Sequence, residues 1–498
     1  MRVACLLLAA AFGLAAQSLK DFEKKVTEFT LPNGLHFIVV ERHEAPVVSF
    51  HTYVDAGSVN DPGGRTGIAH MFEHMAFKGT EQIGTKDWAA EKKALEEVEQ
   101  VYDRLEAEKR KRRKADPQRL KTLETSLKLA IERANLYADS SVFARIIEEN
   151  GGVGLNASTG MDSTRYYYNF PANRIELWFL LESRRFLTPV YREFYKERDV
   201  VLEERRMRVE SNPQGKLMEM LISTAFAAHP YGNMPGGWAS DIVNLRVEDA
   251  AQFFRNYYQP GNLTMAVVGD VNPAEVKKLA ERYFGTLPAG PLPPLLHTEE
   301  PPQEGPKRVF VESPSQPLAF VAYKRPDQYH QDDPVLDVIG GILSSGRTGV
   351  LYRELVRDRK LSLAAAASPS FPGSKFKNLF LFFLVPSAGK TVEDNLKAFD
   401  EILEDFKGRT VDNETLSRVK TKTRAAVIRQ LDSNSGLAAA LSSYQANYGD
   451  WRKLFTSLDE IDKVTAAEVQ TAARKYFVPS ARTIAQTVAP AKAAGGAR

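Results

Sequence analysis

The stretch GIAHMFEHMAFKGT, residues 67–80, carries two histidines and a glutamate in the order His70, Glu73 and His74. Positions i, i+3 and i+4 share one face of an α-helix, so a helix here places both imidazoles side by side with the carboxylate next to them. Two histidines one turn apart are a pair of nitrogen ligands suited to zinc. A neighbouring carboxylate that is not itself a ligand can accept a proton from metal-bound water. The stretch therefore predicts two ligands and the general base of a zinc hydrolase.

The alternative interpretation is that these three side chains share a helix by coincidence. The chain has only eight histidines, so two at metal spacing are not a result of histidine abundance. The flanking residues are apolar and predict a buried helix. A buried helix carries ionisable side chains only when they have a partner, and a metal ion is such a partner.

Composition and charge restrict the class of protein. The 498 residues are 43% hydrophobic and 26% charged, as in soluble globular proteins, and their number suffices for two or more domains. The net charge of +3 gives no reason to expect nucleic acid as a partner. Beyond the N-terminus no stretch reaches the roughly 18 apolar residues of a membrane span.

The N-terminal segment, residues 1–16, has the pattern of a secretory signal peptide. Met1-Arg2 is a short positive start, residues 3–14 are apolar, and Ala15-Ala16 are small. We expect cleavage there, and a periplasmic or secreted mature protein. The only cysteine, Cys5, lies inside the apolar run, so the mature chain has no cysteine ligand for a metal.

Two related halves are predicted from a linker and a repeat. Residues 287–306 contain seven prolines and read as the connector. The segment 242–260 resembles the segment 461–479 without a change of offset along its length, and a short strand is expected after each. We therefore expect a zinc-bearing domain at 17–286, a second homologous domain without a zinc motif at 307–490, and a flexible tail at 491–498.

The expected fold class is α+β, with each half an antiparallel-rich sheet covered on one side by helices. Residues 87–138 change character and read as a helical hairpin inserted into the first half, because Asp116-Pro117 interrupts two stretches rich in Glu, Lys, Arg, Leu and Ala. The basic run at 109–114 is interpreted as the solvated tip of this hairpin rather than as a polyanion-binding signal.

A zinc hydrolase normally has three protein ligands and an open position for water, so a third ligand must lie outside residues 70–74. Without cysteine it must be a carboxylate or another histidine. The predicted helix at 192–208 carries five carboxylates and is the richest source, and Glu197 and Glu204, two helical turns apart, share one of its faces.

At this point the chain resembles the pitrilysin/insulinase family of zinc metallopeptidases, the H-x-x-E-H inverzincins, over nearly the whole mature sequence. The likeness is to the two-domain subfamily that includes the mitochondrial processing peptidase and bacterial periplasmic members. The segments that carry it are HMFEHMAFKGT (70–80), NAST (156–159) with Thr164 and Tyr166 to Tyr168, KERDVVLEERRMR (196–208) and HPYG (229–232).

The resemblance implies a zinc-dependent endopeptidase that hydrolyses peptides or unfolded segments, with one Zn²⁺ per chain. It implies Glu204 as the third ligand beside His70 and His74, with Glu73 as general base on zinc-bound water. It further implies Glu197 as an acid close to the catalytic site. Asn156 and Ala157 then lie on an edge strand that pairs with the substrate backbone. The interval between His74 and Glu204 is longer than is usual in the family, and the hairpin insertion accounts for the excess.

One departure from the family pattern concerns the second half. Complete family members have an Arg and a Tyr at a fixed spacing that hold the substrate, whereas the matching positions here are Val356 and Leu363. We therefore hypothesise a heterodimer with a related zinc-less subunit that supplies this Arg/Tyr pair, and a homodimer is the alternative.

Two other functions stay open. The first is a non-catalytic peptide-binding or structural subunit of the same superfamily, against which the intact set His70, Glu73, His74 and Glu204 argues. The second is another zinc hydrolase such as an amidase, and the NAST strand favours peptides over small amides.

Overall fold

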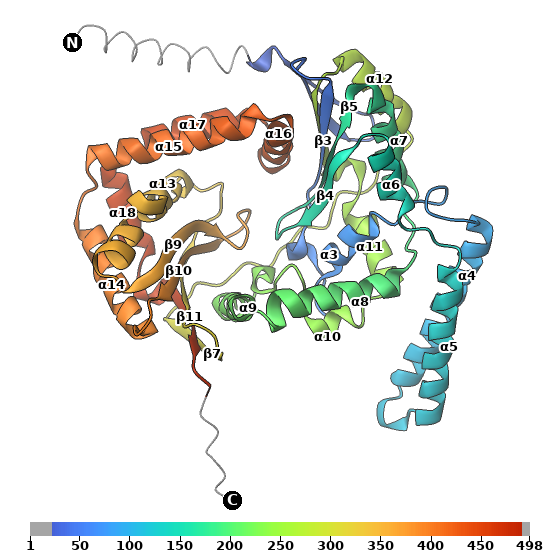
Figure 1. The fold of residues 1–498 in the computed structure, drawn as a ribbon, viewed down its shortest axis with the longest axis horizontal. Helices are drawn as coiled ribbons and strands as arrows, with labels where there is room; N and C mark the ends of the chain where they lie inside the picture. The colour runs from blue at the N-terminus through green and yellow to red at the C-terminus, as the bar shows by residue number, and fades with distance from the viewer. Residues whose placement is uncertain (1–21, 491–498) are drawn as a thin grey trace, which may run out of the picture.

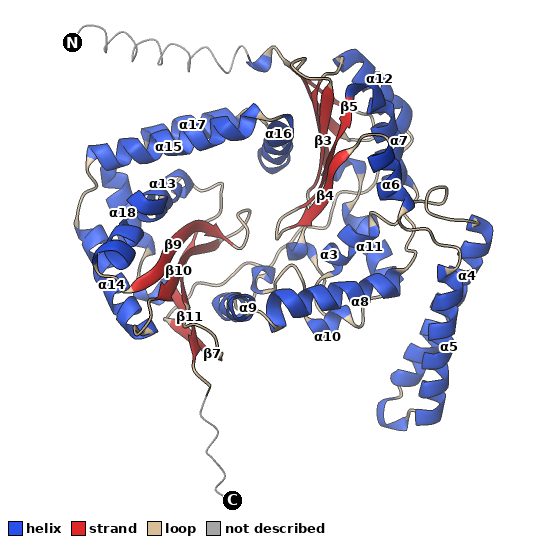
Figure 2. Ribbon diagram, in the orientation of Figure 1, coloured by secondary structure: helices blue, strands red, loops and turns tan. Residues whose placement is uncertain are grey.

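The computed structural model describes residues 22–490, and the predicted signal peptide and C-terminal tail lie outside this range. Two β-sheets, each with its own set of helices, occupy opposite sides of the molecule (Figure 1 and Figure 2). This arrangement agrees with the α+β class of two related halves.

The first sheet has six strands in the order β1-β2-β6-β3-β5-β4. All neighbours are antiparallel except β2 and β6. A tight turn at Asn33-Gly34 joins the first two strands, and Gly34 has the positive φ of 94° that such a turn favours. The strands are β1 (Val26–Thr30), β2 (His36–Glu41), β3 (Val47–Val54), β4 (Val153–Thr159), β5 (Thr164–Pro171) and β6 (Leu263–Gly269).

The second sheet repeats this topology with one strand fewer, in the order β7-β11-β8-β10-β9, with β7 and β11 parallel. Its strands are β7 (Lys307–Glu312), β8 (Ala319–Arg325), β9 (Ser362–Phe371), β10 (Asn378–Pro386) and β11 (Arg482–Val488). The repeat read from the sequence recurs here, because helix α11 (Val247–Tyr257) and strand β6 have counterparts in helix α18 (Ala466–Tyr476) and strand β11.

Most of the remaining helices follow the expected pattern. Those of the first half are α3 (Ile68–Met75), α4 (Trp88–Lys109), α5 (Pro117–Asn135), α6 (Val142–Glu149), α7 (Ile175–Leu187), α8 (Phe194–Arg205), α9 (Pro213–Ala225), α10 (Ala239–Ile242) and α12 (Pro273–Phe284). Those of the second half are α13 (Asp333–Ser344), α14 (Val392–Gly408), α15 (Asn413–Asp432), α16 (Asn434–Tyr448) and α17 (Lys453–Lys463). A π-helical segment, η8 (Tyr352–Asp358), precedes strand β9.

Each sheet is covered by helices on both faces. The helices on one face come from the same half of the chain, and the helix on the other face comes from the other half. Helix α16 packs its Leu437 and Leu441 against the face of the first sheet that carries Ile38 and Val268. Helix α9 packs in the same way on the second sheet, against Phe320 and Leu381 among others. The sequence-based expectation of helices on one side holds within each half, and this exchange of α9 and α16 completes both cores.

Further contacts join the two halves around the linker. The buried Glu300, within the proline-rich segment, accepts hydrogen bonds from the backbone N–H groups of Ala227, Ala228 and His229. Asp162 of the first half accepts the backbone N–H of Ser374 at 2.7 Å. Lys324 of the second half also pairs with Glu300 at 3.0 Å, so the connector is fixed to both halves.

The insertion forms the predicted hairpin of α4 and α5, and it projects from the body of the first half (Figure 1). The C-terminal part of α4 is anchored to the first half by aromatic packing, since the rings of Tyr102 and Tyr195 stack with centroids 5.1 Å apart. Within residues 22–490 no helix combines the length and hydropathy that crossing a membrane requires.

Candidate metal centre

Helix α3 lies between the end of strand β4 and helix α8 (Figure 1). Its buried side packs Met71 and Phe72 into the core, where Phe72 contacts Tyr258 at a ring-centroid distance of 4.3 Å. The carboxylate of Asp61 accepts the backbone N–H groups of Gly67 and Ala69, at 2.6 and 3.0 Å. This contact satisfies two free donors at the start of the helix and fixes its direction. The exposed side of α3 therefore has a defined orientation.

That side presents His70 and His74, whose rings lie perpendicular with centroids 4.9 Å apart. Glu204, from the last turn of α8, points between them. Its Oε2 lies 3.7 Å from Nε2 of His70 and 3.4 Å from Nε2 of His74. One ligand atom from each of the three residues lies within 4.8 Å of the other two. The two helices thus bring together the three residues proposed as ligands.

This donor set fits zinc. Tetrahedral zinc with bonds of about 2.0–2.1 Å places neighbouring ligand atoms roughly 3.4 Å apart, close to the separations found here. Arg208 forms an ion pair with Oε1 of Glu204 at 2.7 Å, which leaves the other oxygen directed at the histidines. The Nδ1 atom of His70 is buried and has no hydrogen-bond partner within the described part of the chain, so the ring is held by packing alone. Burial and the neighbouring His74 lower the pKa of His70 to about 4, so the ring is neutral, as a metal ligand must be.

Glu73 extends from the same face without joining the three ligand atoms. It forms hydrogen bonds with Thr159 at the end of β4, and burial raises its pKa above the ordinary value. A carboxylate with a raised pKa beside a metal site is suited to accept and return a proton.

A chain of charged groups lies behind His74. Its Nδ1 is 3.3 Å from Oε2 of Glu197, and Lys78 forms a short ion pair with the other oxygen of Glu197. Lys78 also lies 3.4 Å from Glu193, which begins α8 in a left-handed conformation with φ of 56°. Burial alone would raise the pKa of Glu197, yet His74 and Lys78 lower it to about 2. Glu197 is therefore an ionised partner that orients the His74 ring.

Replacing Lys78 with methionine should weaken zinc binding by about 10- to 100-fold, the range found when partners of ligand histidines are removed. The reason is that Glu197 would lose the cation that fixes its carboxylate against His74. Competition with a chromophoric chelator measures this change. The control is Lys93→Met, an exposed lysine on α4, which should bind zinc like the parent protein. Unchanged affinity in Lys78→Met would show that Glu197 needs no such support.

The candidate ligands open onto a pocket of about 510 Å³. One wall is strand β4, the edge strand of the first sheet, with Asn156 exposed and Ala157 half-buried. An edge strand offers unpaired backbone groups to an extended chain. The residues that line the pocket are His70, Glu73, His74, Phe77, Lys78, Ser140, Ala144, Asn156, Ala157, Ser158, Thr159, Glu197, Glu204 and Arg208.

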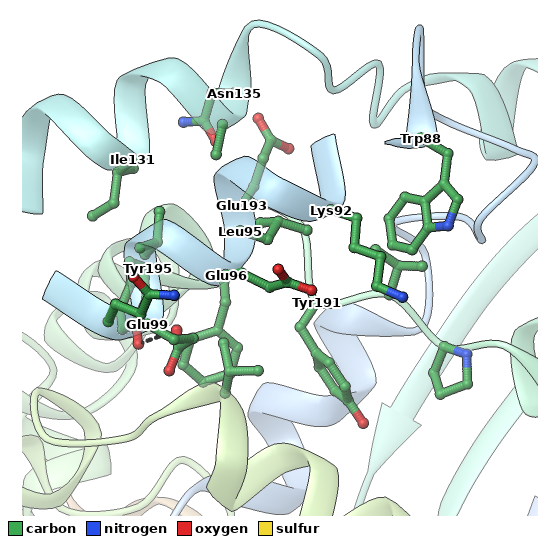
Figure 3. Close-up of a pocket in the computed structure, with 17 residues that line it drawn as sticks. Trp88, Lys92, Leu95, Glu96, Glu99, Ile131, Asn135, Tyr191, Glu193 and Tyr195 are labelled. Carbon is green, nitrogen blue, oxygen red and sulfur yellow. Dashed lines mark hydrogen bonds between the residues drawn. The ribbon is translucent and has the colours of Figure 1, made fainter. Parts of the chain in front are cut away.

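A second pocket, of about 480 Å³, lies between α4, α5 and the start of α8 (Figure 3). Its walls are largely apolar, and Glu99 in it accepts the hydroxyl hydrogen bond of Tyr195 at 2.7 Å. Glu193 lines this pocket and also lies beside Lys78, which lines the pocket at the candidate ligands. None of the three candidate ligands lines the second pocket.

The two positions that depart from the family pattern lie in the second half. Val356 belongs to η8, and Leu363 stands on the edge strand β9 with 64% of its surface exposed. Neither lines the pocket at the candidate ligands. These two positions therefore hold apolar side chains, where the family pattern has the guanidinium of Arg and the hydroxyl of Tyr.

Sequence reasoning assigned no role to Lys78, Thr159 or Arg208, although all three contact the site. Two of them were detectable from spacing. Lys78 follows His74 by four residues and Arg208 follows Glu204 by four, the spacing of neighbours on a helical face. In the structure Lys78 lies just beyond the end of α3, and Arg208 lies in the π-helical segment Arg206–Glu210 that follows α8. Thr159 required the packing of β4 against α3, which no local pattern reveals.

Comparison with protein families gives two matches. The model of the insulinase family (peptidase family M16) matches residues 37–92, which include His70, Glu73 and His74. The peptidase M16 inactive domain matches residues 244–423, a range that begins before α11 and ends within α15.

Individual relatives extend over almost the whole chain. The chain is 29% identical over 471 residues to zinc protease PqqE of Helicobacter pylori, covering 91% of this chain and 92% of that protein. It is 24% identical to a probable mitochondrial-processing peptidase subunit beta of Arabidopsis thaliana, covering 91% and 76% respectively. A crystal structure of a protease from Helicobacter pylori superposes with a TM-score of 0.78 at 26% identity, covering 93% of this chain and 99% of that one.

Proposed function

Since the chain belongs to the insulinase family (peptidase family M16), we propose that it is a zinc-dependent endopeptidase acting on peptides or unfolded segments. The observation that carries the proposal is the grouping of His70, His74 and Glu204 at zinc spacing, with Glu73 beside them and outside the ligand set. Relatives named zinc proteases add support at the level of the family.

In the proposed reaction His70, His74 and Glu204 hold the metal, which supplies the Lewis acidity that a scissile carbonyl needs to accept a nucleophile. Glu73 takes the proton of the attacking water and later gives it to the leaving amine. Thr159 holds the Glu73 carboxylate in place for both transfers. Glu197, fixed by Lys78, keeps the His74 ring in its ligating orientation.

The substrate is proposed to bind as an added strand on β4. Backbone groups near Asn156 and Ala157 would pair with an extended peptide and place one of its carbonyls above α3. An extended segment fits the pocket beside this strand, whereas a folded domain does not present a free strand. This geometry favours peptides and unfolded segments as substrates.

We propose further that full activity needs a related subunit that carries an Arg/Tyr pair, because Val356 and Leu363 stand at the matching positions in this chain. The signal sequence at residues 1–16 supports export, and we propose that the mature protein acts in the periplasm or outside the cell.

The test of the function is hydrolysis of an internally quenched peptide by the full chain, alone and with a related subunit that carries the Arg/Tyr pair. We expect turnover that a chelator removes and zinc restores, and we expect it to be much faster with the second subunit. Full turnover by the lone chain would exclude the need for a partner. No turnover in either arrangement would favour the non-catalytic, peptide-binding alternative, with which the match to the inactive domain is compatible.

A double substitution tests the same idea within one chain. Val356→Arg with Leu363→Tyr should raise peptide turnover about tenfold or more. In other enzymes a single hydrogen-bond donor to the transition state contributes ~10²–10³-fold to the rate, and we expect the new pair to recover part of such an effect. The matched control, Val356→Ala with Leu363→Ala, should give no gain. A double variant no faster than the parent would show that these positions do not reach the substrate.

A further inference from the structure

The tip of the α4–α5 hairpin carries a dense positive charge that the proposed peptidase chemistry does not use. Residues 109–114 are all Lys or Arg and all are exposed. The turn is the free end of the hairpin (Figure 1), and at its start Arg110 lines a surface pocket together with Asp241 and Arg246 of the first half. Nothing in the metal centre or its pocket contacts this segment.

The acidic residues near the tip are already neutralised. Both Lys111 and Arg119 pair with Glu108, at 2.6 and 3.2 Å, and Lys109 lies 3.5 Å from Glu106. Asp116 accepts backbone N–H groups at the start of α5. The local carboxylates are therefore occupied.

Four cations of the run 109–114 have no ion-pair partner within residues 22–490. The side chains of Arg110, Arg112, Arg113 and Lys114 have no hydrogen bond or salt bridge to the described chain, and we call these four residues the basic tip. Arg112 adopts a left-handed conformation with φ of 54° at the turn. Like charges this close repel one another, so the basic tip adds nothing to the stability of the hairpin.

The sequence alone favoured a solvated hairpin tip over a polyanion-binding signal; from the exposure and lack of ion-pair partners of these four residues we propose instead that the basic tip is a docking surface for an anionic lipid membrane. A flat layer of anionic headgroups needs only accessible cations, and each Lys or Arg near such a surface strengthens partitioning by about fivefold. Specific protein interfaces depend on buried aromatic or apolar anchors, and single-stranded nucleic acids on aromatic stacking. The turn from Glu106 to Arg119 contains no aromatic residue, and its only apolar side chains are two alanines and a proline.

The projection of the hairpin suits this partner. Since the basic tip lies far from the two sheets, it reaches a planar surface while the pocket at β4 stays accessible. The attraction is electrostatic, so it must weaken as salt shortens the Debye length from about 10 Å at 0.1 M to about 3 Å at 1 M.

Vesicle co-sedimentation of the full chain tests the proposal, with vesicles of phosphatidylcholine alone and of phosphatidylcholine mixed with phosphatidylglycerol in equal parts. We expect binding to the anionic vesicles only, with loss at high salt. Replacing the four residues of the basic tip by glutamine should reduce partitioning by about two orders of magnitude or more, given about fivefold for each residue. Circular dichroism of the variant verifies that the helices remain folded.

The matched control removes the same number of charges from exposed positions on the body of the molecule. It replaces with glutamine Lys216, Lys278, Arg347 and Lys397. This variant should bind anionic vesicles like the parent. Equal losses in both variants would reduce the effect to total charge and overturn the proposal. Absence of binding by the parent, or binding to duplex DNA in preference to vesicles, would overturn it as well.

Discussion

Glu73→Gln should retain zinc and lose peptide hydrolysis by about 10²–10⁴-fold, the contribution of a positioned general base. The amide keeps the shape of the side chain and its contact with Thr159 but cannot accept the proton of the attacking water. The three candidate ligand atoms are untouched, since Glu73 is not one of them. Zinc content by atomic absorption and turnover of a quenched peptide, measured on one preparation with the partner subunit present, verify both parts.

The matched control is Glu81→Gln, a nearby exposed glutamate that lies outside the pocket, and it should leave both readouts unchanged. If Glu73→Gln lost its zinc, the residue would be a ligand rather than a base. If it kept full turnover, another group would have to carry the proton and the proposed mechanism would fail.

Local patterns sufficed for most of the elements around the site. The break at Asp116-Pro117 predicted the turn between α4 and α5, because such a break depends on the backbone preferences of a few residues. The spacing of His70, Glu73 and His74 placed three side chains on one face of α3 for the same reason. Each of these inferences concerns residues close together in the chain.

The exchange of α9 and α16 could not be predicted in this way. The strand Leu263–Gly269 is buried along its whole length, and its sequence shows only that both faces are covered. Which helix covers the second face is settled by packing between residues such as Val268 and Leu441, which belong to different halves of the chain. A periodicity of apolar residues contains no information on such a pairing.

The same limit applies within the metal centre. Helix geometry made Glu197 and Glu204 joint candidates and did not choose between them, and the choice of Glu204 came from the family resemblance. In the structure Glu204 faces both histidines through their Nε2 atoms, whereas Glu197 reaches only Nδ1 of His74 and is held there by Lys78. Glu204 is therefore placed as a candidate ligand and Glu197 as a partner of the His74 ring, and this difference depends on how α3 and α8 pack against each other.

Glu204→Gln should lower zinc affinity by more than about 100-fold, beyond the 10- to 100-fold that follows from loss of an outer partner. The amide oxygen is a weak, neutral donor, and Arg208 would lose the carboxylate that it now holds at 2.7 Å. Chelator competition measures the affinity. Thermal melting gives a second readout, because zinc at 100 times its dissociation constant adds about 2.7 kcal/mol to the free energy of unfolding of a protein that binds it.

The neighbouring Glu203→Gln is the control for this substitution, since Glu203 is exposed and pairs with Arg206 away from the histidines. Glu203→Gln should bind zinc and gain thermal stability from it, whereas Glu204→Gln should show neither. Normal zinc affinity in Glu204→Gln would require another third ligand, and Glu197, 3.3 Å from His74, would be the first to examine.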